Sequence, residues 1–530
     1  MTTDNTAMWT KGWRELVWSA LDQRWDLIVA GGGITGAGIL REATRAGLRA
    51  LLVEGQDFAS GTSSRSSKLV HGGLRYLGNL QIKLTLESVR ERERLLNEGP
   101  GLVEPLENIL ASYSGDRPPA WVMGAGLMVY DILAMKWRHK HHTAGQVKAL
   151  CPSINLERMA GGYSYFDAQT DDARLVLRVI AEAVRAGGTA LNYAFVEGLL
   201  RDRSGQVHGI QLRDRITGAQ KEVRAPVVIS ATGAWADQLR SHLGRKPQLR
   251  PLRGSHLFFP WNKLPLTQSI SFLHPADRRP VFAYPWEGVT LVGTTDVDQR
   301  GEASADPRLS GDEIEYLMQA VTHAFKPLDL RWNDVQSTIS GVRAVVDTGQ
   351  ADPSKESRDF VLWDENGLLT VTGGKLTTFR LMARKALDAV RGKLPGRSND
   401  SASQRVLDPC PMLDAGLAPL AKARLLGRYG AQAPELIRSA AADELTSIGA
   451  SPSLWAELRW AARAEGVVHL DDLLLRRVRL GIIAPQGGLP LMDRIRSIAQ
   501  PELGWEDARW QAEAAAYASL WRRCYSAGEP

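Results

Sequence analysis

The sequence predicts an α/β fold over most of its length and an all-helical segment at its C-terminal end. A short apolar run at residues 26–30 is followed by a dense glycine segment, a helical pattern and a second apolar run that ends at residue 54. This order of strand, turn, helix and strand is typical of a doubly wound parallel sheet. Residues from about 250 to 370 alternate strands with few helices, and the chain beyond residue 403 is rich in Ala, Leu, Arg and Trp. We therefore expect a β-rich second part and a separate helical part.

The composition is that of a folded globular protein. Its 530 residues are enough for two to four domains at roughly 150 residues each, and for an interior that can bury a large cofactor. Hydrophobic residues make up 44% and charged residues 23%, which excludes a disordered, collagenous or coiled-coil chain. The net charge of +6 suits an anionic small substrate or an acidic membrane surface. Because we find no run of five or six basic residues and no basic stripe with interleaved aromatics, we expect no nucleic-acid partner.

The cysteines and the N-terminus restrict the compartment. Cys151, Cys410 and Cys524 lie far apart, with no spacing typical of a metal site or of a disulfide framework, so we expect no metal and a reducing compartment. The N-terminus lacks the charged and apolar regions of a secretion signal, and no run of about eighteen apolar residues occurs. We therefore expect a cytoplasmic chain that does not span a membrane.

The glycine segment has the spacing of a phosphate-binding turn. Gly31, Gly33 and Gly36 form a GxGxxG motif between the first strand and a helix. The first glycine permits a tight turn, the second a close approach to a pyrophosphate, and the third close packing of helix on strand. The helix N-terminus then directs N–H groups at the phosphates, and Glu54 ends the next strand, where a carboxylate can accept hydrogen bonds from a ribose diol. In this context the motif predicts a Rossmann-like dinucleotide site rather than a structural turn.

Three further segments favour FAD over NAD. Residues 60–68 are crowded with small hydroxyl side chains and include two cations, Arg65 and Lys68, which suits a pyrophosphate and an isoalloxazine. Residues 231–233 (Ala-Thr-Gly) end a third apolar strand, and Gly373-Gly374 precede a helix whose N–H dipoles could face a reduced flavin. Each segment alone is compatible with an ordinary turn, but together they indicate FAD.

Seven segments spread over residues 26 to about 390 resemble, in the same order, the motifs of FAD-dependent sn-glycerol-3-phosphate dehydrogenases. The segments are 31–38, 66–77, 171–175, 254–256, 293–296, 340–343 and 373–378. Residues 473–481 also resemble that family's helical C-terminal cap. The resemblance implies oxidation of glycerol 3-phosphate to dihydroxyacetone phosphate, with a hydride moving from C2 to flavin N5 and electrons passing to a membrane quinone.

The residues expected to bind FAD lie in or beside the glycine motif, the hydroxyl segment and the two distant glycine sites, with Glu54 and Val196 outside these segments. They are Gly31, Gly33, Ile34, Thr35, Gly36, Glu54, Thr62, Ser63, Ser66, Ser67, Lys68, Leu69, His71, Gly72, Gly73, Val196, Ala231, Thr232, Gly233, Trp235, Gly373, Gly374, Lys375, Leu376 and Thr377.

The substrate phosphate requires planar guanidinium groups or several ammonium contacts. The resemblance implies that a cationic pocket lies opposite the flavin, and that its substrate-binding residues are Arg75, Tyr76, His256, Arg343, Arg358 and Lys375. Among these, His256, Arg343 and Lys375 are expected to act in catalysis. The hydroxyl proton must also leave, and histidine has the side-chain pKa nearest neutrality. His256 and His71 are the two candidates; His71, beside Gly72, could instead contact the cofactor or cap a turn.

The predicted domains are interleaved along the chain. We expect an amphipathic helix at residues 1–24, with Trp9 and Trp13 on its apolar face, which could rest at a lipid interface or pack on the protein. The other predicted parts are an FAD-binding domain within 25–395 (about 25–110, 160–250 and 340–395), a substrate domain with an antiparallel sheet (about 111–159 and 251–339), a linker at 396–403 and an all-α domain at 404–530.

Several alternatives remain open at this point. Ser230 and Ala344 stand where the family commonly has Asn and Pro, and the surroundings of Glu107 are less apolar than is usual. A related polyol phosphate such as erythritol phosphate is therefore an alternative substrate, and an oxidase that reduces oxygen is an alternative activity. A catalytically silent flavin scaffold would keep the glycines without the cationic pocket, and an NAD-dependent dehydrogenase would be colourless. We expect peripheral attachment to the cytoplasmic face of an anionic inner membrane, and a homodimer is open.

Overall fold

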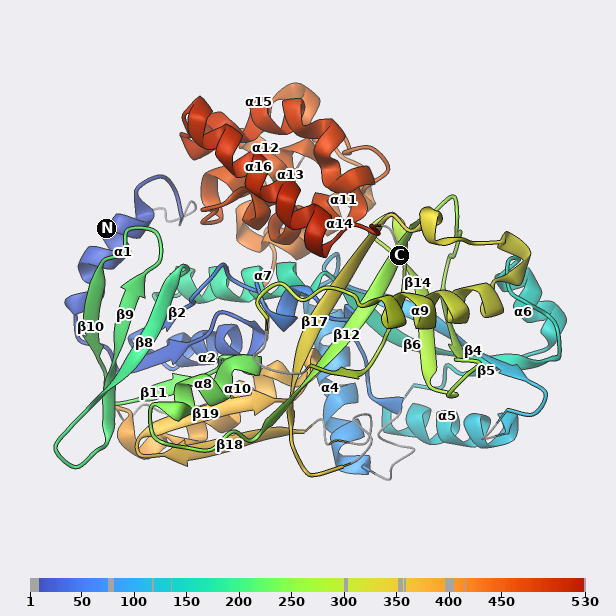
Figure 1. Ribbon diagram of the computed structural model, residues 1–530, viewed down its shortest axis with the longest axis horizontal. Helices are drawn as coiled ribbons and strands as arrows, with labels where there is room; N and C mark the ends of the chain where they lie inside the picture. Colours follow the sequence, from blue (N-terminus) through green and yellow to red (C-terminus); the bar gives the residue numbers. More distant parts are fainter. Residues whose placement is uncertain are drawn as a thin grey trace.

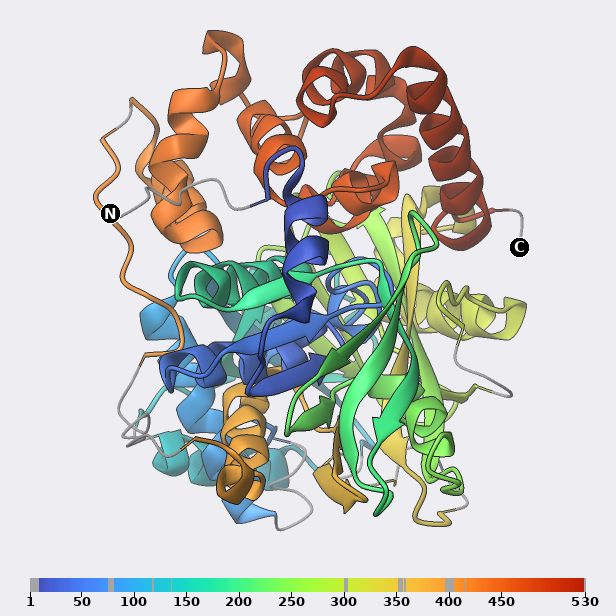
Figure 2. The same ribbon diagram turned by 90° about the vertical axis from the view of Figure 1, so that its left-hand side faces the viewer.

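The computed structural model shows three parts: a parallel sheet with its helices, a large antiparallel sheet, and a helical domain that covers one side of both (Figures 1 and 2). The residues that the structure describes are 9–74, 81–116, 119–134, 136–299, 304–350, 356, 359–395, 405–414 and 416–528. This confirms the predicted fold class. The predicted linker at 396–403 lies outside the described residues.

The first part is built on a six-stranded sheet in the order β18-β19-β11-β1-β2-β7. Its strands are β1 (Leu27–Ala30), β2 (Ala50–Val53), β7 (Thr189–Leu191), β11 (Val228–Ser230), β18 (Phe360–Glu365) and β19 (Leu368–Gly373). Neighbouring strands are parallel except β18, which is antiparallel to β19. β1, β2 and β11 are buried along their whole length, because a parallel sheet is covered on both faces.

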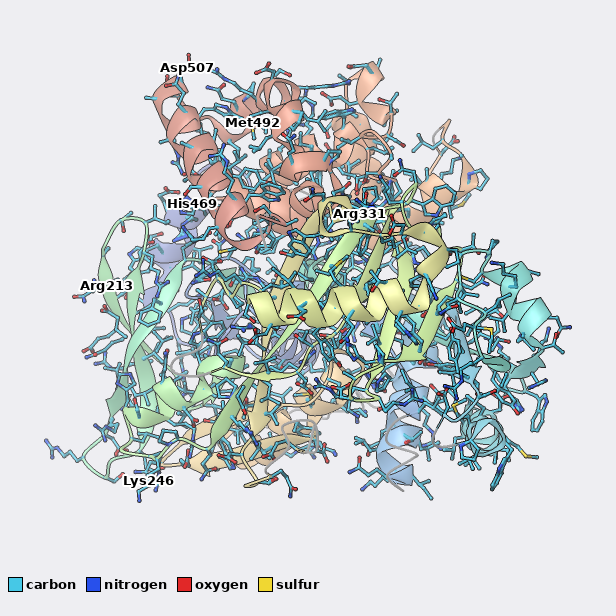
Figure 3. The ribbon with its side chains drawn as sticks, turned by 45° about the vertical axis from the view of Figure 1, so that its right-hand side comes forward. Arg213, Lys246, Arg331, His469, Met492 and Asp507 are labelled. Atoms are coloured by element: carbon cyan, nitrogen blue, oxygen red, sulfur yellow. The ribbon has the colours of Figure 1, made fainter. Side chains whose placement is uncertain are left out.

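Helices cover one face of this sheet and a small sheet covers the other. The helices are α2 (Ile34–Arg45), α7 (Asp172–Arg185) and α10 (Phe379–Ala389); the small sheet consists of β8 (Ala194–Arg201), β9 (Val207–Asp214) and β10 (Gln220–Arg224). A Cβ atom on Gly38 of α2 would lie 2.8 Å from Cδ2 of Phe379, so glycine permits the close packing of α2 on α10. Figure 3 shows Arg213 of β9 on the outer side of the small sheet.

The second part is a ten-stranded, mostly antiparallel sheet. Its strands are β3 (Leu69–Val70), β4 (Val103–Tyr113), β5 (Lys140–His142), β6 (Met159–Thr170), β12 (Leu249–Pro260), β13 (Ser269–Leu273), β14 (Pro280–Trp286), β15 (Val289–Gly293), β16 (Val297–Asp298) and β17 (Ser337–Val346). Helix α9 (Gly311–Ala324) lies across this part in Figure 3. The expected domain boundaries near residues 110, 160 and 340 fall inside β4, β6 and β17, so these three strands belong to the large sheet throughout.

The described part of the N-terminal segment packs on the protein. Helix α1 runs only from Trp13 to Ser19, and Trp9 and Trp13 are buried. The ring of Trp9 lies 5.5 Å from the ring of Phe58, centroid to centroid. The indole rings of both tryptophans are covered by protein, which agrees with the expectation that this segment packs on the protein.

The third part is the helical domain. It contains α11 (Pro419–Tyr429), α12 (Ala433–Ser439), α13 (Trp455–Ala464), α14 (Leu480–Ile483), α15 (Met492–Leu503) and α16 (Asp507–Cys524). Figure 3 shows Asp507 at the end of this domain that lies away from the sheets. Across the described ranges of the chain, no helix combines the length and the apolar character needed to cross a bilayer.

Candidate cofactor and substrate site

A cavity of about 920 Å³ is lined by residues of both the parallel sheet and the large antiparallel sheet. Its volume lies in the range of small-molecule sites. Most of the residues that the sequence predicted for the site line this cavity. They are Gly31, Gly33, Ile34, Thr35, Glu54, Thr62, Ser63, Ser66, Ser67, Lys68, Leu69, His71, Gly73, Val196, Ala231, Thr232, Gly233, Trp235, Arg343, Gly373, Gly374, Lys375 and Leu376.

At one end, the cavity meets the turn between β1 and α2. Gly31 has a φ of +113°, and a side chain there would clash with the carbonyl oxygen of Ala231. The backbone N–H of Ile34, in the first turn of α2, donates a hydrogen bond of 3.0 Å to Ser63 Oγ. The positive end of this helix therefore lies at the cavity, where it favours a phosphate.

Glu54 is held at the same end by two backbone groups. Gly32 N–H donates to its Oε2 at 2.6 Å and Gln56 N–H donates to its Oε1 at 2.8 Å. Burial raises the pKa of Glu54 above its usual value, although both backbone hydrogen bonds lower it. Each carboxylate oxygen can accept more than one hydrogen bond, so Glu54 can still accept a hydrogen bond from a ribose hydroxyl. Together with the glycine turn and the N-terminus of α2, this arrangement fits an extended dinucleotide.

A second glycine turn lies farther along the cavity. Gly373 and Gly374 have φ angles of +79° and +74°, which side chains rarely adopt. The turn connects β19 to a short helical turn at Leu376–Thr378 and then to α10. It brings the backbone of residues 373–376 to the cavity wall.

The hydroxyl segment 60–68 differs from our prediction in one respect. Thr62 and all of its serines except Ser64 line the cavity, as expected, but its two cations are paired with carboxylates. The Lys68 side chain has no exposed surface, and its Nζ lies 2.9 Å from Asp172 Oδ1. The guanidinium of Arg65 bonds Asp306 Oδ1 at 2.9 Å. Both residues line the cavity, but each charged end is paired with a carboxylate distant in sequence.

His256 lies directly behind the cavity wall. Its side chain is buried on β12, its Nε2 is 2.8 Å from Ser67 Oγ, and its Nδ1 has no hydrogen-bond partner among the described residues. Burial lowers the pKa of His256 well below 6.5, and the positive charges of Arg343 and Lys68 lower it further. His256 itself does not line the cavity, whereas its hydrogen-bond partner Ser67 does.

Arg343 of β17 does reach the cavity. Its guanidinium bonds Asp296 Oδ1 at 3.0 Å, Thr294 Oγ1 at 3.0 Å and the Thr295 carbonyl oxygen at 3.2 Å. A side chain on Gly254, in the neighbouring strand, would clash with this guanidinium. The resembling segments 254–256, 293–296 and 340–343 thus meet at one point, and Lys375 lines the same cavity.

Two further cations at this end were missed by the sequence analysis. Arg278 and Arg279, before β14, line the cavity and pair with Asp116 and Asp277. Burial would lower the pKa of Arg279, but hydrogen bonding and the charge of Asp277 raise it. Two consecutive arginines between strands match no sequence motif. Only their position beside the cavity identifies them as candidate site residues.

Some predicted residues do not line the cavity. Gly36 packs against the backbone of Gly31, Gly72 packs against the hydroxyl of Tyr130, and Thr377 Oγ1 donates to the His71 carbonyl oxygen at 3.2 Å. These three support the wall rather than form it. Arg75, Tyr76 and Arg358 lie outside the described residues. Within the part of the chain that the structure covers, no group of His, Cys, Asp or Glu side chains could hold a metal ion.

The helical domain contacts the cofactor end through buried ion pairs. Asp57, three residues after Glu54, accepts hydrogen bonds from Arg476 Nε at 2.5 Å and from Arg477 Nη1 at 2.6 Å. Arg479 Nη2 donates at 2.8 Å to the carbonyl oxygen of Ser64 in the hydroxyl segment. The helical domain therefore fixes two positions, Asp57 and Ser64, that directly follow the cavity-lining residues Gln56 and Ser63.

Comparison with known proteins identifies the class. Residues 26–380 match the family described as FAD dependent oxidoreductase, and residues 382–510 match the C-terminal domain of alpha-glycerophosphate oxidase. The solved structure of a glycerol-3-phosphate dehydrogenase from Bacillus halodurans, complexed with FAD, has a TM-score of 0.76 and 27% identity, and the match covers 97% of this chain and 98% of that one. The protein is a flavoprotein oxidoreductase, and its cofactor is FAD.

The relatives narrow this class to one family. Glycerol-3-phosphate dehydrogenase 2 of Mycobacterium tuberculosis is 33% identical over 530 residues, 95% of this chain and 89% of the relative. Aerobic glycerol-3-phosphate dehydrogenase of Bacillus subtilis is 38% identical over 376 residues, 70% of this chain and 67% of the relative. The chain belongs to the family of FAD-dependent glycerol-3-phosphate dehydrogenases, which confirms the resemblance found in the sequence.

Proposed function

We propose that this enzyme oxidises sn-glycerol 3-phosphate to dihydroxyacetone phosphate and passes the electrons to a respiratory quinone. One observation carries the proposal: the cavity that begins at the dinucleotide turn continues to Arg343, Lys375 and Arg279. A single cavity therefore offers both a cofactor site and cations for a small phosphate. The names of the relatives support the same substrate and, for the Bacillus subtilis relative, an aerobic pathway.

The phosphate end of the substrate is assigned to the cations of this cavity. A guanidinium presents planar paired donors to phosphate oxygens, and an ammonium adds a compact positive charge. Arg343 is oriented by Asp296 and Thr294, so little side-chain freedom is lost when it binds a ligand. Lys375 follows the glycine turn at 373–374, on the cofactor side of the cavity. These positions would hold the substrate between the phosphate-binding cations and the flavin.

When bound, FAD accepts the hydride that leaves C2 of the substrate. The proton of the C2 hydroxyl must leave as well, and Ser67 is the residue that connects the cavity to a base. Its Oγ lies on the wall and 2.8 Å from Nε2 of His256. Ser67 Oγ can therefore accept the proton of the substrate hydroxyl while its own hydroxyl proton moves to Nε2 of His256. In this proposal His256 acts through Ser67 and does not touch the substrate.

The decisive experiment uses the flavin absorbance of the purified protein. Under anaerobic conditions glycerol 3-phosphate should bleach this absorbance, and a quinone analogue should restore it. Erythritol 4-phosphate, tested in parallel, should bleach it more slowly. Bleaching by erythritol 4-phosphate but not by glycerol 3-phosphate would contradict the proposed substrate. Reoxidation by oxygen as fast as by quinone, with release of hydrogen peroxide, would contradict the proposed electron acceptor.

We also propose that the enzyme works at the cytoplasmic face of the inner membrane, because respiratory quinones are dissolved in the bilayer. The net charge of +6 supports this location, since cytoplasmic leaflets are anionic. Sedimentation of activity with membranes at low salt, and its release at high salt, would test peripheral attachment. Activity that stays in the supernatant at every salt concentration would contradict it.

A further inference from the structure

Arg279 lines the cavity with one edge of its guanidinium engaged by protein. Its Nε donates a hydrogen bond of 2.6 Å to Asp277 Oδ2. Because this contact uses the Nε edge, the Nη1 and Nη2 groups are left for a ligand. Two parallel N–H donors of this kind match two oxygens of one phosphate.

Asp277 is itself held in place. The Tyr316 hydroxyl, from helix α9, lies 3.1 Å from both carboxylate oxygens of Asp277 and donates to them. The backbone N–H of Arg279 donates to Asp277 Oδ1 at 3.1 Å. Burial would raise the pKa of Asp277, but the hydrogen bonds and the charge of Arg279 outweigh it and lower that pKa below its usual value. Asp277 is therefore an ionised partner for the Arg279 guanidinium.

The ring of Tyr316 gives Arg279 a second support. The Cζ of Arg279 lies 5.2 Å from the centroid of this ring, within the distance of a cation–π contact. The ring also stacks on His274, with the two centroids 3.7 Å apart and the two planes at 2°. His274 is buried, and its Nε2 lies 2.9 Å from the carbonyl oxygen of Tyr316. A buried imidazole therefore fixes the ring that Arg279 contacts.

Helix α9 is also anchored beside Arg343. Glu313 lies three residues before Tyr316, so the two side chains are neighbours on the helix surface. Its Oε1 accepts hydrogen bonds from Thr295 Oγ1 at 2.7 Å and from Ser255 Oγ at 2.8 Å. The carbonyl oxygen of Thr295 in turn accepts a hydrogen bond from Arg343. One helix therefore contacts the immediate surroundings of both arginines.

Asp296 lies near both guanidinium groups. It pairs with Arg343 Nη1 at 3.0 Å. Burial would lower the pKa of Arg279, but Asp277, Tyr316 and Asp296 together raise it, so Asp296 also acts electrostatically on Arg279. All three groups at this point, Arg279, Asp296 and Arg343, line the same cavity.

The contacts of Tyr316 and Asp277 restrict a side chain that would otherwise move. The Arg279 side chain is 36% exposed, and a long side chain at such a position samples several rotamers, which it must give up when it binds a ligand. Contacts that hold it in one rotamer lower this entropic cost and so strengthen binding, although they do not touch the ligand.

We propose that Arg279 is a phosphate ligand beside Arg343, and that Tyr316 and Asp277 are the positioning residues that aim its two Nη groups into the cavity. Two guanidinium groups suit a phosphate monoester, which offers three terminal oxygens and about two negative charges. The identity of the phosphate ester rests on the proposed function, whereas the binding of inorganic phosphate can be measured without it.

The test compares two substitutions of Tyr316 in the FAD-loaded protein. Tyr316→Leu should weaken binding of inorganic phosphate, measured by titration calorimetry, about tenfold. It should raise KM for glycerol 3-phosphate by the same factor and leave kcat unchanged, because the reacting atoms are not affected. Tyr316→Phe keeps the ring and loses only the hydroxyl, so it should weaken phosphate binding only about threefold.

A double substitution separates positioning from a structural role. If Tyr316 acts through Arg279, Tyr316→Leu should weaken phosphate binding no further once Arg279→Ala is present. Losses that multiply in the double variant, or wild-type phosphate binding by Tyr316→Leu, would overturn the proposal.

The matched control is Tyr113→Leu, which removes a tyrosine of β4 whose hydroxyl donates to the Asn155 carbonyl oxygen at 3.0 Å. It should bind phosphate like the wild type; an equal loss in this control would overturn the assignment to Tyr316. A wild-type protein that binds phosphate through Arg279 but does not oxidise glycerol 3-phosphate would support this inference and contradict the proposed function.

Discussion

Ser67 Oγ lies 2.8 Å from Nε2 of His256, and through this contact a buried imidazole reaches the cavity. His256 is 1% exposed, and of these two residues it is Ser67 that lines the cavity. Burial, with the charges of Arg343 and Lys68, keeps its pKa well below 6.5. His256 is therefore neutral at physiological pH, which leaves it able to accept a hydrogen bond or a proton from Ser67.

Ser67→Ala should lower kcat for glycerol 3-phosphate about a hundredfold, the usual scale for losing a proton-transfer partner. KM should change little, because the phosphate-binding cations are untouched. Flavin content should stay at one per chain. Steady-state kinetics with a soluble dye acceptor measures both constants. Ser60→Ala, which removes another hydroxyl from the cavity wall, is the control and should retain kcat.

The pH profile separates His256 from other groups. Because the folded pKa of His256 lies well below 6.5, this residue should not change charge between pH 6 and 8. The ratio of kcat in the wild type to kcat in His256→Gln should then be constant over that range. A ratio that varies about tenfold, with an inflection near pH 6.5, would show that His256 titrates normally and would contradict its burial.

Arg343→Ala should raise KM for glycerol 3-phosphate about tenfold to a hundredfold, since it removes charge-assisted hydrogen bonds to phosphate. FAD should remain bound, because the dinucleotide end of the cavity is formed by other residues. Arg331→Ala removes an exposed arginine that pairs with Asp329 and lies on the surface in Figure 3; it should leave KM unchanged. If Arg343→Ala loses flavin and activity together, Arg343 supports the fold and is not a phosphate ligand.

Glu54→Gln should weaken FAD binding about tenfold. The carboxylate accepts the backbone N–H groups of Gly32 and Gln56, whereas an amide has one oxygen and would face the second donor with its NH₂ group. Fluorescence titration of apoprotein with FAD measures the affinity. Glu157→Gln, at an exposed position paired with Lys326, should bind FAD like the wild type. Equal affinities for FAD in the two variants would contradict the proposed role of Glu54 in binding the cofactor.

The parallel sheet could be predicted because its signal is local: β1, the glycine turn, α2 and β2 follow one another within residues 27–53. The domain boundaries could not be predicted in the same way. β4 and β6 pair with each other although helix α5 (Ala120–Ala134) lies between them in the sequence, and no local pattern shows which sheet a strand will join. Helix α5 was missed because apolar residues lie on both of its sides, so the sequence lacks the periodicity of an amphipathic helix.

The small residues of the site were predicted better than its charges. Glycine positions follow from backbone geometry, which a motif records. A cation depends on its partner: Lys68 is paired with Asp172 and Arg65 with Asp306, both more than about a hundred residues away. The sequence gives no distance between such groups, so a cation near a predicted cofactor cannot be assigned to it without the fold.

Asp57→Asn should destabilise the protein by about 3–5 kcal/mol, because it leaves the guanidinium groups of Arg476 and Arg477 buried without their shared carboxylate. Asp57 has no exposed surface, so water cannot replace the lost charge. FAD affinity should fall as well, since Asp57 lies in the segment that follows Glu54. Thermal unfolding followed by tryptophan fluorescence, with and without added FAD, measures both effects.

The pH dependence of this destabilisation has a defined sign. Burial alone would raise the pKa of Asp57, but the charges of Arg477 and Arg476 outweigh it and lower that pKa from 3.8 to about 2. A carboxyl group whose folded pKa is depressed stabilises the fold above its unfolded pKa and loses this contribution as pH falls towards the folded value. The difference in unfolding free energy between wild type and Asp57→Asn should therefore shrink as pH falls below about 4. Asp507→Asn, which removes an exposed partner of Arg496, should show no such difference at any pH. If Asp57→Asn behaves like Asp507→Asn, the ion pairs do not hold the helical domain on the cofactor segment.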